Sequence, residues 1–281
     1  MRYSELHSQA PLNTFIECFW SLESDNDIVS PQPERILPDG CVELILNFGS
    51  PFTQHNDDVQ QSVQPQNFIV GQMTQPILIS PTGLVELIGI RFHPGGTVPF
   101  FRLPMHELTN RVVELGSVAR ALEAKLKAAT EGCHRLADKI ADLEHLLMNL
   151  LLESKTDFRL LRIASKIVER AGSLSIDDLA DGSGLSNRQL ERRFLNDVGL
   201  GPKLLSRILR FQQVFRAVEA NRMSWPEVAI DCGYYDQAHL IKDFRQFANQ
   251  TPSILFAQQS RLSESFTRKN RVSNFSNTRL G

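Results

Sequence analysis

The sequence contains one short pattern twice, as LADGSGLSNRQLERRF from Leu179 to Phe194 and as VAIDCGYYDQAHLIKDF from Val228 to Phe244. Gly184 and Gly233 are 49 residues apart, and the alanines near the start of the two copies have the same spacing. A glycine between two apolar stretches favours a turn where one helix must end and the chain adopts a left-handed conformation. Each copy therefore predicts a helix, a tight turn and a second helix.

The second helix of each copy has a cap and two distinct faces. Ser186 and Asp236 can accept hydrogen bonds from the free N–H groups at its start. Leu190 with Phe194, and Leu240 with Phe244, are spaced to share one buried side. The opposite sides carry Asn187, Arg188, Gln189, Arg192 and Arg193 in the first copy and Gln237, His239, Lys242 and Arg245 in the second. Such side chains reach base edges and phosphates when a helix lies in a major groove.

Residues from about Phe158 to Phe256 resemble the DNA-binding domain of AraC/XylS-type bacterial transcriptional regulators. The matching residues are Leu179, Ala180, Gly184, Leu185, Ser186, Leu190, Arg193 and Phe194, then Val228, Ala229, Gly233, Tyr234, Phe244, Arg245, Phe247, Thr251 and Pro252. The resemblance implies two recognition helices in successive major grooves. It puts base-facing positions at Arg188, Glu191 and Arg192, and at Gln237, Ala238, His239 and Lys242.

The candidate DNA-binding residues are therefore Asn187, Arg188, Gln189, Arg192, Gln237, Ala238, His239, Lys242 and Arg245. Arginine can grip guanine and glutamine can grip adenine in a bidentate manner, and Ala238 can touch a thymine methyl. The alternative for each is solvent or phosphate contact alone. Glu191 either accepts from cytosine or pairs with Arg188, and Arg193 can instead bond within the fold.

The two halves of the chain differ in charge. The 281 residues suffice for two domains with real cores. Residues 1–154 contain 10 Lys and Arg against 19 Asp and Glu, a net charge of −9, whereas residues 155–281 contain 20 against 13, a net charge of +7. Chance drift is one explanation. The other is an acidic sensor or assembly module joined to a basic nucleic-acid module.

The first hundred residues predict short strands. Apolar runs fenced by Gly or Pro occur at residues 14–20, 41–48, 67–70, 77–80 and 84–92, which favours a β-sandwich or barrel. Residues 54–66 are polar and without periodicity, so they predict a mobile loop.

Residues 104–153 predict helices, one near 118–129 and a longer one at 133–153. Leu136, Ile140, Leu143, Leu147 and Leu150 repeat at the spacing of a coiled-coil seam. This seam predicts either a homodimer interface or packing inside its own domain.

Three further stretches, LPDGCVELI from Leu37, IRFHPGG from Ile90 and ELTNR from Glu107, resemble an N-terminal module of uncharacterised function found in some AraC-type regulators. This resemblance implies a cupin-like barrel followed by dimerising helices. The predicted fold class is thus α+β with two domains: a β-rich region (1–100) plus helices (104–153) within 1–154, and an all-α domain with two helix-turn-helix units at 155–257. Residues 258–281 predict a basic, disordered tail.

Residue patterns for other chemistry are weak. His93 stands alone and no His-x-His occurs, so no metal site is expected. Cys41 invites comparison with reactive-cysteine repair proteins that also carry AraC-like domains, but its apolar strand favours a buried structural thiol. No phosphate-binding or dinucleotide-binding motif occurs, and no cofactor is expected. No Cys-x-x-C pair, signal peptide or membrane-length apolar run is present, which predicts a reduced cytoplasmic protein.

The sequence thus predicts a regulator that binds double-stranded DNA at specific sites. Its first domain would sense a small-molecule effector or form a homodimer, and the resemblance implies RNA polymerase as a further partner. The main alternative is a DNA-binding enzyme with catalysis in the first domain. A constitutive regulator whose first domain only dimerises is the third possibility. A closed, partly apolar pocket of about a few hundred Å³ in the β-rich region would favour the sensor over the dimeriser.

Overall fold

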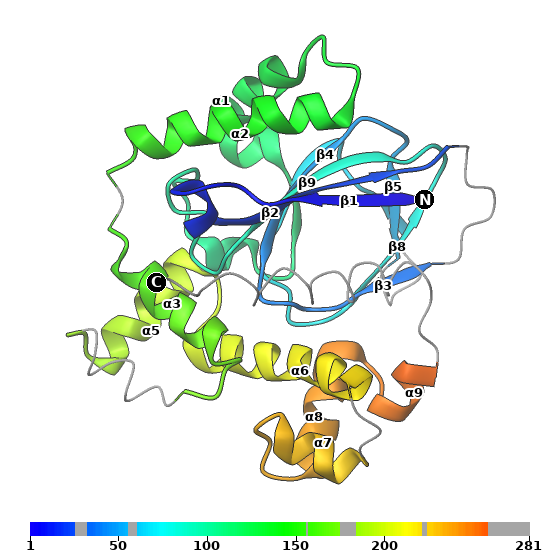
Figure 1. Cartoon of the computed structure of the whole chain (residues 1–281), viewed down its shortest axis with the longest axis vertical. Coiled ribbons are helices and arrows are strands. Elements are labelled where there is room, and N and C mark those ends of the chain that lie inside the picture. The colour runs from blue at the N-terminus through cyan, green and yellow to red at the C-terminus, as the bar shows by residue number, and fades with distance from the viewer. Residues whose placement is uncertain (26–32, 56–60, 156, 175–183, 221–223, 258–281) are drawn as a thin grey trace.

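The computed structural model describes residues 1–25, 33–55, 61–155, 157–174, 184–220 and 224–257 (Figure 1). Strands and then two helices make up the N-terminal part, and further helices make up the C-terminal part, so the predicted α+β class is confirmed. The domain limits at residues 154 and 257 stay predictions. The expected basic tail, 258–281, lies outside the described residues.

The strands form two antiparallel sheets. The six-stranded sheet has, in spatial order, β1 (Arg2–Leu6), β2 (Ile16–Glu23), β9 (Glu86–Phe92), β4 (Val42–Asn47), β7 (Asn67–Val70) and β10 (Val112–Glu114). The four-stranded sheet has β3 (Glu34–Ile36), β8 (Ile77–Pro81), β5 (Phe52–His55) and β6 (Gln61–Val63). The apolar runs of the sequence correspond to β2, β4, β7, β8 and β9.

The expected cupin-like closed barrel is wrong, because both sheets stay open. β1 and β10 form the edges of one sheet, and β3 and β6 form the edges of the other. The two sheets meet through side chains and share no strand in the described part of the chain. The loop expected at 54–66 is also partly wrong, since β5 runs to His55 and pairs with β6. Polar residues can pair at a sheet edge through their backbone alone, without an apolar pattern.

The six-stranded sheet is buried on both faces. Phe19 of β2 lies in the core beneath helices α1 (Leu115–Thr130) and α2 (Leu136–Glu153), whereas its neighbour Trp20 lies in the core between the sheets. Side chains alternate across a strand, so burial on both faces produces a continuous apolar run. Gly89 lies opposite Trp20, and a Cβ there would be 2.0 Å from the indole ring. The indole therefore requires glycine at position 89.

The leucine seam of α2 packs inside its own domain. Leu143 and Leu147 are fully buried, and Leu151 rather than Leu150 continues the buried stripe. Helix α1, the 3-10 turn η1 (Leu12–Thr14) and the six-stranded sheet cover this stripe. A homodimer built on the 136–150 seam is therefore excluded, because the side chains that would form it are the core of one subunit.

The C-terminal helices gather around one long helix, α6 (Pro202–Ala220) (Figure 1). One core joins α3 (Arg159–Glu169) and α5 (Asn187–Asp197) to the start of α6. A second core joins α7 (Trp225–Asp231), α8 (Gln237–Ala248) and α9 (Pro252–Ala257) to the rest of α6. Phe211 anchors this second core, with its ring 4.8 Å from that of Phe244. The first helix of the first repeat, expected from Leu179, lies outside the described residues.

The position of the α2 seam yields a stability prediction. Leu143→Ala should lower the free energy of unfolding by about 2–5 kcal/mol, because it leaves a cavity in a closed core. The matched control, Leu152→Ala, truncates a side chain on the same helix that is 71% exposed. This control should change stability by no more than about 0.5 kcal/mol.

Denaturant titration checks both values, and ultracentrifugation of the folded proteins checks the oligomeric state. A Leu143→Ala protein that keeps full stability but dissociates into smaller species would contradict the packing described above.

Candidate nucleic-acid interface and ligand pocket

The first repeat presents α5 with a complete cap. Gly184 has φ +68°, which is the left-handed turn that the sequence predicts. The Ser186 hydroxyl accepts a hydrogen bond from the backbone N–H of Gln189. In return, the Gln189 side-chain oxygen accepts hydrogen bonds from the backbone N–H of Ser186 (3.0 Å) and from its hydroxyl (3.1 Å). Gln189 is therefore engaged in the capping box.

The second repeat has the same construction. Gly233 has φ +76°, and the Asp236 carboxylate accepts a hydrogen bond of 2.7 Å from the backbone N–H of His239. Ser224 and Glu227 form a capping box at the start of α7. Tyr235, in the turn between α7 and α8, is 88% exposed, and sequence reasoning did not single it out. The exposure of this side chain, in the turn that precedes α8, is visible only in the structure.

The candidate DNA-binding residues lie on the outer sides of α5 and α8. Leu190, Phe194, Leu240 and Phe244 are fully buried, as the repeat predicts. Asn187, Arg188, Gln189, Arg192, Ala238, Lys242 and Arg245 are exposed, while Gln237 and His239 are half-buried. The His239 ring lies edge-on to Tyr234, with centroids 5.2 Å apart. In the described part of the chain no ion pair is recorded for the four basic residues of this set, Arg188, Arg192, Lys242 and Arg245.

Two other residues of α5, Arg193 and Glu191, contact other parts of the chain. The guanidinium of Arg193 lies 3.7 Å from the Asp157 carboxylate. The carboxylate of Glu191 lies against Gly201, where a Cβ would be 2.2 Å from its oxygen. Gly201 immediately precedes α6, and a carboxylate beside a helix N-terminus is favourably placed. These contacts give both residues a structural role that accounts for their positions without DNA.

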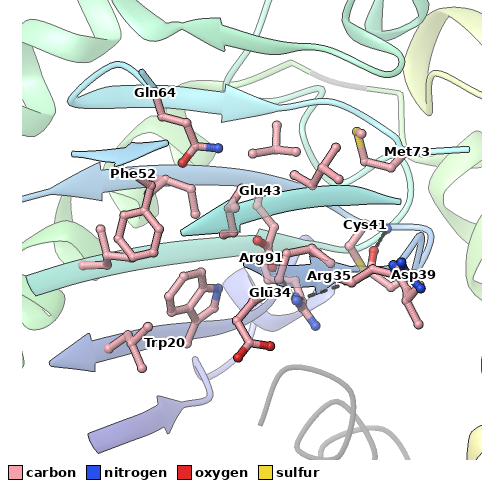
Figure 2. Close-up of a pocket in the computed structure, with 18 of the residues that line it drawn as sticks. Trp20, Glu34, Arg35, Asp39, Cys41, Glu43, Phe52, Gln64, Met73 and Arg91 are labelled. Atoms are coloured by element: carbon pink, nitrogen blue, oxygen red, sulfur yellow. Dashed lines mark hydrogen bonds and ion pairs between the residues drawn. The ribbon is translucent and has the colours of Figure 1, made fainter. Parts of the chain in front are cut away.

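A cavity of about 100 Å³ lies between the two sheets (Figure 2). Its walls are mainly apolar and include Trp20, Phe52 and Phe68. Charged side chains, Glu34, Arg35, Asp39, Glu43 and Arg91, line the rest. The volume is below the several hundred Å³ of sites for drug-sized ligands, so the cavity suits a small molecule.

Arg91 is the centre of the charged side of this cavity. It is 4% exposed and lies opposite Glu43 in the pairing of β9 with β4. Its Nε donates to Glu43 at 2.7 Å, and its Nη2 lies 3.3 Å from Asp39. Burial, reinforced by Glu43, raises the pKa of Asp39 to about 6 although Arg91 lowers it. One buried arginine thus faces two carboxylates and does not fully compensate them.

The thiol of Cys41 borders the same cavity. Burial raises the pKa of Cys41 well above its usual range, and the carboxylates of Asp39 and Glu17 raise it further. The thiol donates a hydrogen bond of 3.4 Å to Glu17. A protonated thiol is a poor nucleophile, which favours the structural role over a reactive one. Among the described residues, no group of three or more His, Cys, Asp or Glu side chains is placed to hold a metal ion, and burial lowers the pKa of His93.

The loop between β3 and β4 joins this cavity to α6. Leu37, Asp39 and Cys41 line the cavity. The Pro38 carbonyl accepts a hydrogen bond of 2.5 Å from the Gln212 side chain of α6. Gly40 has φ +86°, and a Cβ there would lie 3.1 Å from the Leu205 side chain. This loop, residues 37–41, therefore touches the cavity on one side and α6 on the other.

Contacts outside this loop also hold the two parts together. The Thr109 hydroxyl donates a hydrogen bond of 2.7 Å to the carbonyl of Gly199, which follows α5. The Phe15 and Phe158 rings meet edge-on at 5.3 Å. Sequence reasoning missed Asp39 and Arg91 as site residues, although both lie in stretches that carry the second resemblance.

Known proteins resemble the two ends of the chain separately. Residues 4–114 match a family described as a domain of unknown function (DUF6597), and residues 179–258 match a family described as a helix-turn-helix domain. The HTH-type transcriptional regulator MtrA of Neisseria gonorrhoeae is 26% identical over 137 residues, which are 48% of this chain and 44% of MtrA. The matched region thus spans less than half the length of that relative.

Solved structures of ToxT from Vibrio cholerae are also similar. One covers 86% of this chain and 99% of its own at 8% identity, with a TM-score of 0.44. Another, bound to (E)-4-(8-methylnaphthalen-1-yl)but-3-enoic acid, covers 85% and 98% at 10% identity, with a TM-score of 0.45. None of the described helices is long and apolar enough to cross a membrane.

The raised pKa of Asp39 yields a pH prediction. In the unfolded chain Asp39 loses its proton near pH 4, whereas in the folded chain it keeps it to about pH 6. The contribution of Asp39 to the free energy of unfolding is therefore fully present below about pH 4 and is lost as the pH rises to about 6. The groups that face Asp39 are Arg91, Glu43, Glu17 and Cys41.

Asp39→Asn should remove that part of the dependence. Its stability relative to the parent should rise between about pH 4 and about pH 6 and then level off. Denaturant titrations at several pH values measure the difference, with the exposed carboxylate exchange Glu131→Gln as the control. A difference that is flat, or that falls with rising pH, would show that Asp39 is ionised throughout this range in the folded protein.

Proposed function

We propose that this chain, which carries an AraC-type helix-turn-helix domain at residues 179–258, is a transcriptional regulator that binds double-stranded DNA at specific sites. In this proposal α5 and α8 enter successive major grooves, and the N-terminal region receives a signal that changes DNA binding. The observation that carries the proposal is the capped, outward-facing pair of recognition helices at the two ends of α6.

The length of α6 supports the use of two grooves. Its 19 residues span about 28 Å at the rise of an α-helix. Successive major grooves on one face of DNA are about 34 Å apart. Because α5 packs at the start of α6 and α8 packs further along it, the two helices are offset along one helix, as the use of two adjacent grooves requires.

The exposed side chains of α5 and α8 support different tasks. Arg188, Arg192, Lys242 and Arg245 provide positive charge that neutralises phosphates and makes affinity fall with salt. Arg192 also lies opposite the buried Leu190 side of α5, where it can reach a base edge. Gln189 is held by the cap, so its part in this proposal is to fix the start of α5.

The cavity between the sheets, at about 100 Å³, is smaller than the pocket of a few hundred Å³ that would by itself favour a sensor, so the support for a sensor comes from the contact between its lining and α6. The cavity is partly apolar, it is lined by charged groups, and the loop 37–41 connects it to α6. A molecule in the cavity can therefore change the position of that loop. Through Gln212 and Leu205 of α6, this movement can change the relative position of the two helix-turn-helix units. A homodimer would have to use a surface other than the α2 seam. As a transcriptional regulator, the protein would also contact RNA polymerase.

The same cavity does not favour the DNA-binding enzyme. A catalytic site needs a nucleophile or base poised near neutral pH beside a group that orients it. The Cys41 thiol is held protonated, and Glu43 is occupied by Arg91. The regulator accounts for the helices, the charge asymmetry and the cavity together.

The role of Arg192 yields a binding prediction. Arg192→Ala should cost about 1–3 kcal/mol at the preferred site and relax base preference at about one position, with the melting temperature nearly unchanged. Binding to a panel of single-base variants of the selected site, measured by fluorescence anisotropy, checks this. Equal weakening on every variant would make Arg192 a phosphate contact.

Two other exchanges in α5 are the matched controls. Phe194→Ala should lose about 3–5 kcal/mol of stability, and binding with it, because it opens a fully buried core. Gln189→Ala should lose about 1 kcal/mol of stability from the cap while base preference stays unchanged. Thermal melting separates the three variants. A Gln189→Ala protein that melts normally but changes base preference would reverse its assignment.

A further inference from the structure

The charges around the cavity between the sheets are unbalanced. The carboxylates of Glu34, Asp39 and Glu43 line it together with the guanidiniums of Arg35 and Arg91, so the lining has a net charge of −1 when all five are ionised. Glu17, which lies behind the Cys41 thiol, adds a further carboxylate. Arg216 of α6 lies close enough to interact electrostatically with Glu17. The cavity therefore has more negative than positive groups at its polar side.

Arg91 is not available to an anion. Its guanidinium contacts the carboxylates of Glu43 and Asp39, and all three groups are at or near the six-stranded sheet (Figure 2). An anionic ligand beside Arg91 would have to displace one of these carboxylates and leave it buried beside its own charge, which is strongly unfavourable. A cation needs no displacement, because it adds the positive charge that two carboxylates around one arginine lack.

The acidic groups beside Arg91 are held in a buried environment. Burial is the main cause that raises the pKa of Asp39 and the pKa of Cys41; the neighbouring carboxylates raise both further, and Arg91 lowers both. A positive charge bound here would favour the ionised form of Asp39.

The rest of the lining suits an apolar body. Trp20 and Glu34 border the same part of the space, and Phe52 lies across from them (Figure 2). Aromatic faces attract organic cations as well as apolar groups. A cavity of about 100 Å³ limits the ligand to a single small ring or a short chain.

We propose that the cavity binds a small organic cation, with an apolar body against Trp20, Phe52 and Phe68 and a positive head beside Asp39, Glu43 and Glu34. This inference rests on the proposed function only in treating the ligand as the regulatory signal. The positive head lies next to the loop 37–41, so the part of the ligand that determines its class also contacts the element that reaches α6.

Three matched probes, each a short chain of the size that a cavity of about 100 Å³ admits, test the class: butylammonium as the cation, butyrate as the anion and 1-butanol as the neutral analogue. Calorimetric titration of the full chain should give an affinity for the ammonium at least about tenfold above the other two, the factor equivalent to one pKa unit. Stronger binding of the carboxylate, equal binding of all three, or no binding of any would overturn the proposal.

The site of binding is tested separately. The chain has two tryptophans, and Trp225→Phe leaves Trp20 as the one fluorophore of this kind. The ammonium should change the emission of this variant, and Asp39→Asn and Glu34→Gln should each weaken its binding about tenfold, while Glu131→Gln should not. Circular dichroism identifies any variant that fails to fold, in which case the comparison of the three probes on the parent decides. Ammonium binding that both site variants retain in full would overturn the assigned position.

Arg192→Ala separates this proposal from the proposed function. It should leave ammonium binding unchanged, because α5 is not part of the cavity. If the parent binds the ammonium but selects no DNA, the regulator is wrong and the cation site stands. If the parent selects DNA but prefers the carboxylate probe, the cation site is wrong and the regulator stands.

Discussion

The burial of α6 is the constraint on which the other elements depend. Phe211 and Phe215 are fully covered by α7, α8 and α9, while Leu205 is covered by α3 and α5. The β-rich region presses on the same helix through Gly40 and Pro38. A helix that must bury several faces at once cannot shift against one neighbour without disturbing the others, because close-packed interiors move between discrete arrangements. Helices α5 and α8 and the loop 37–41 therefore all pack against the same helix, and a shift of one requires adjustment of the others.

The six-stranded sheet must also bury both of its faces. Leu44 and Ile90 point to α1 and α2, whereas their neighbours Glu43 and Arg91 point to the cavity. Because side chains alternate along a strand, β4 and β9 place a buried ion pair on one face of the sheet and contribute to the apolar core on the other. Asp39 joins this pair from the loop, and burial is the main cause that raises its pKa, with Arg91 lowering it and Glu43 raising it further. If the cavity binds a cation as proposed, the bound positive charge would relieve part of the cost of burying the ionised Asp39.

Local patterns in the sequence predicted most of the elements but few of their long-range partners. The glycines, caps and i, i+4 pairs of the two repeats are confirmed, because a helix-turn-helix is specified by residues close in sequence. The strands with continuous apolar runs were also visible, whereas the edge strands β1, β3, β6 and β10 were not, since an edge needs little apolar character. The order of the strands in the open sheets, the covering of the α2 seam by the sheet and η1, and the pairing of Glu43 with Arg91 depend on residues far apart in the sequence; Glu43 and Arg91 are 48 positions apart. Nothing in a single sequence links such positions.

Hydroxyl-radical footprinting of the full chain on a site selected from a random DNA pool tests the central claim most directly. If α5 and α8 are recognition helices held at the two ends of α6, the cleavage pattern should show two protected segments on one face of the duplex, about 10 base pairs apart. Exchange of Arg192 should weaken protection in one segment, and exchange of Lys242 should weaken it in the other. A single protected segment, or uniform protection that follows no sequence, would contradict the account.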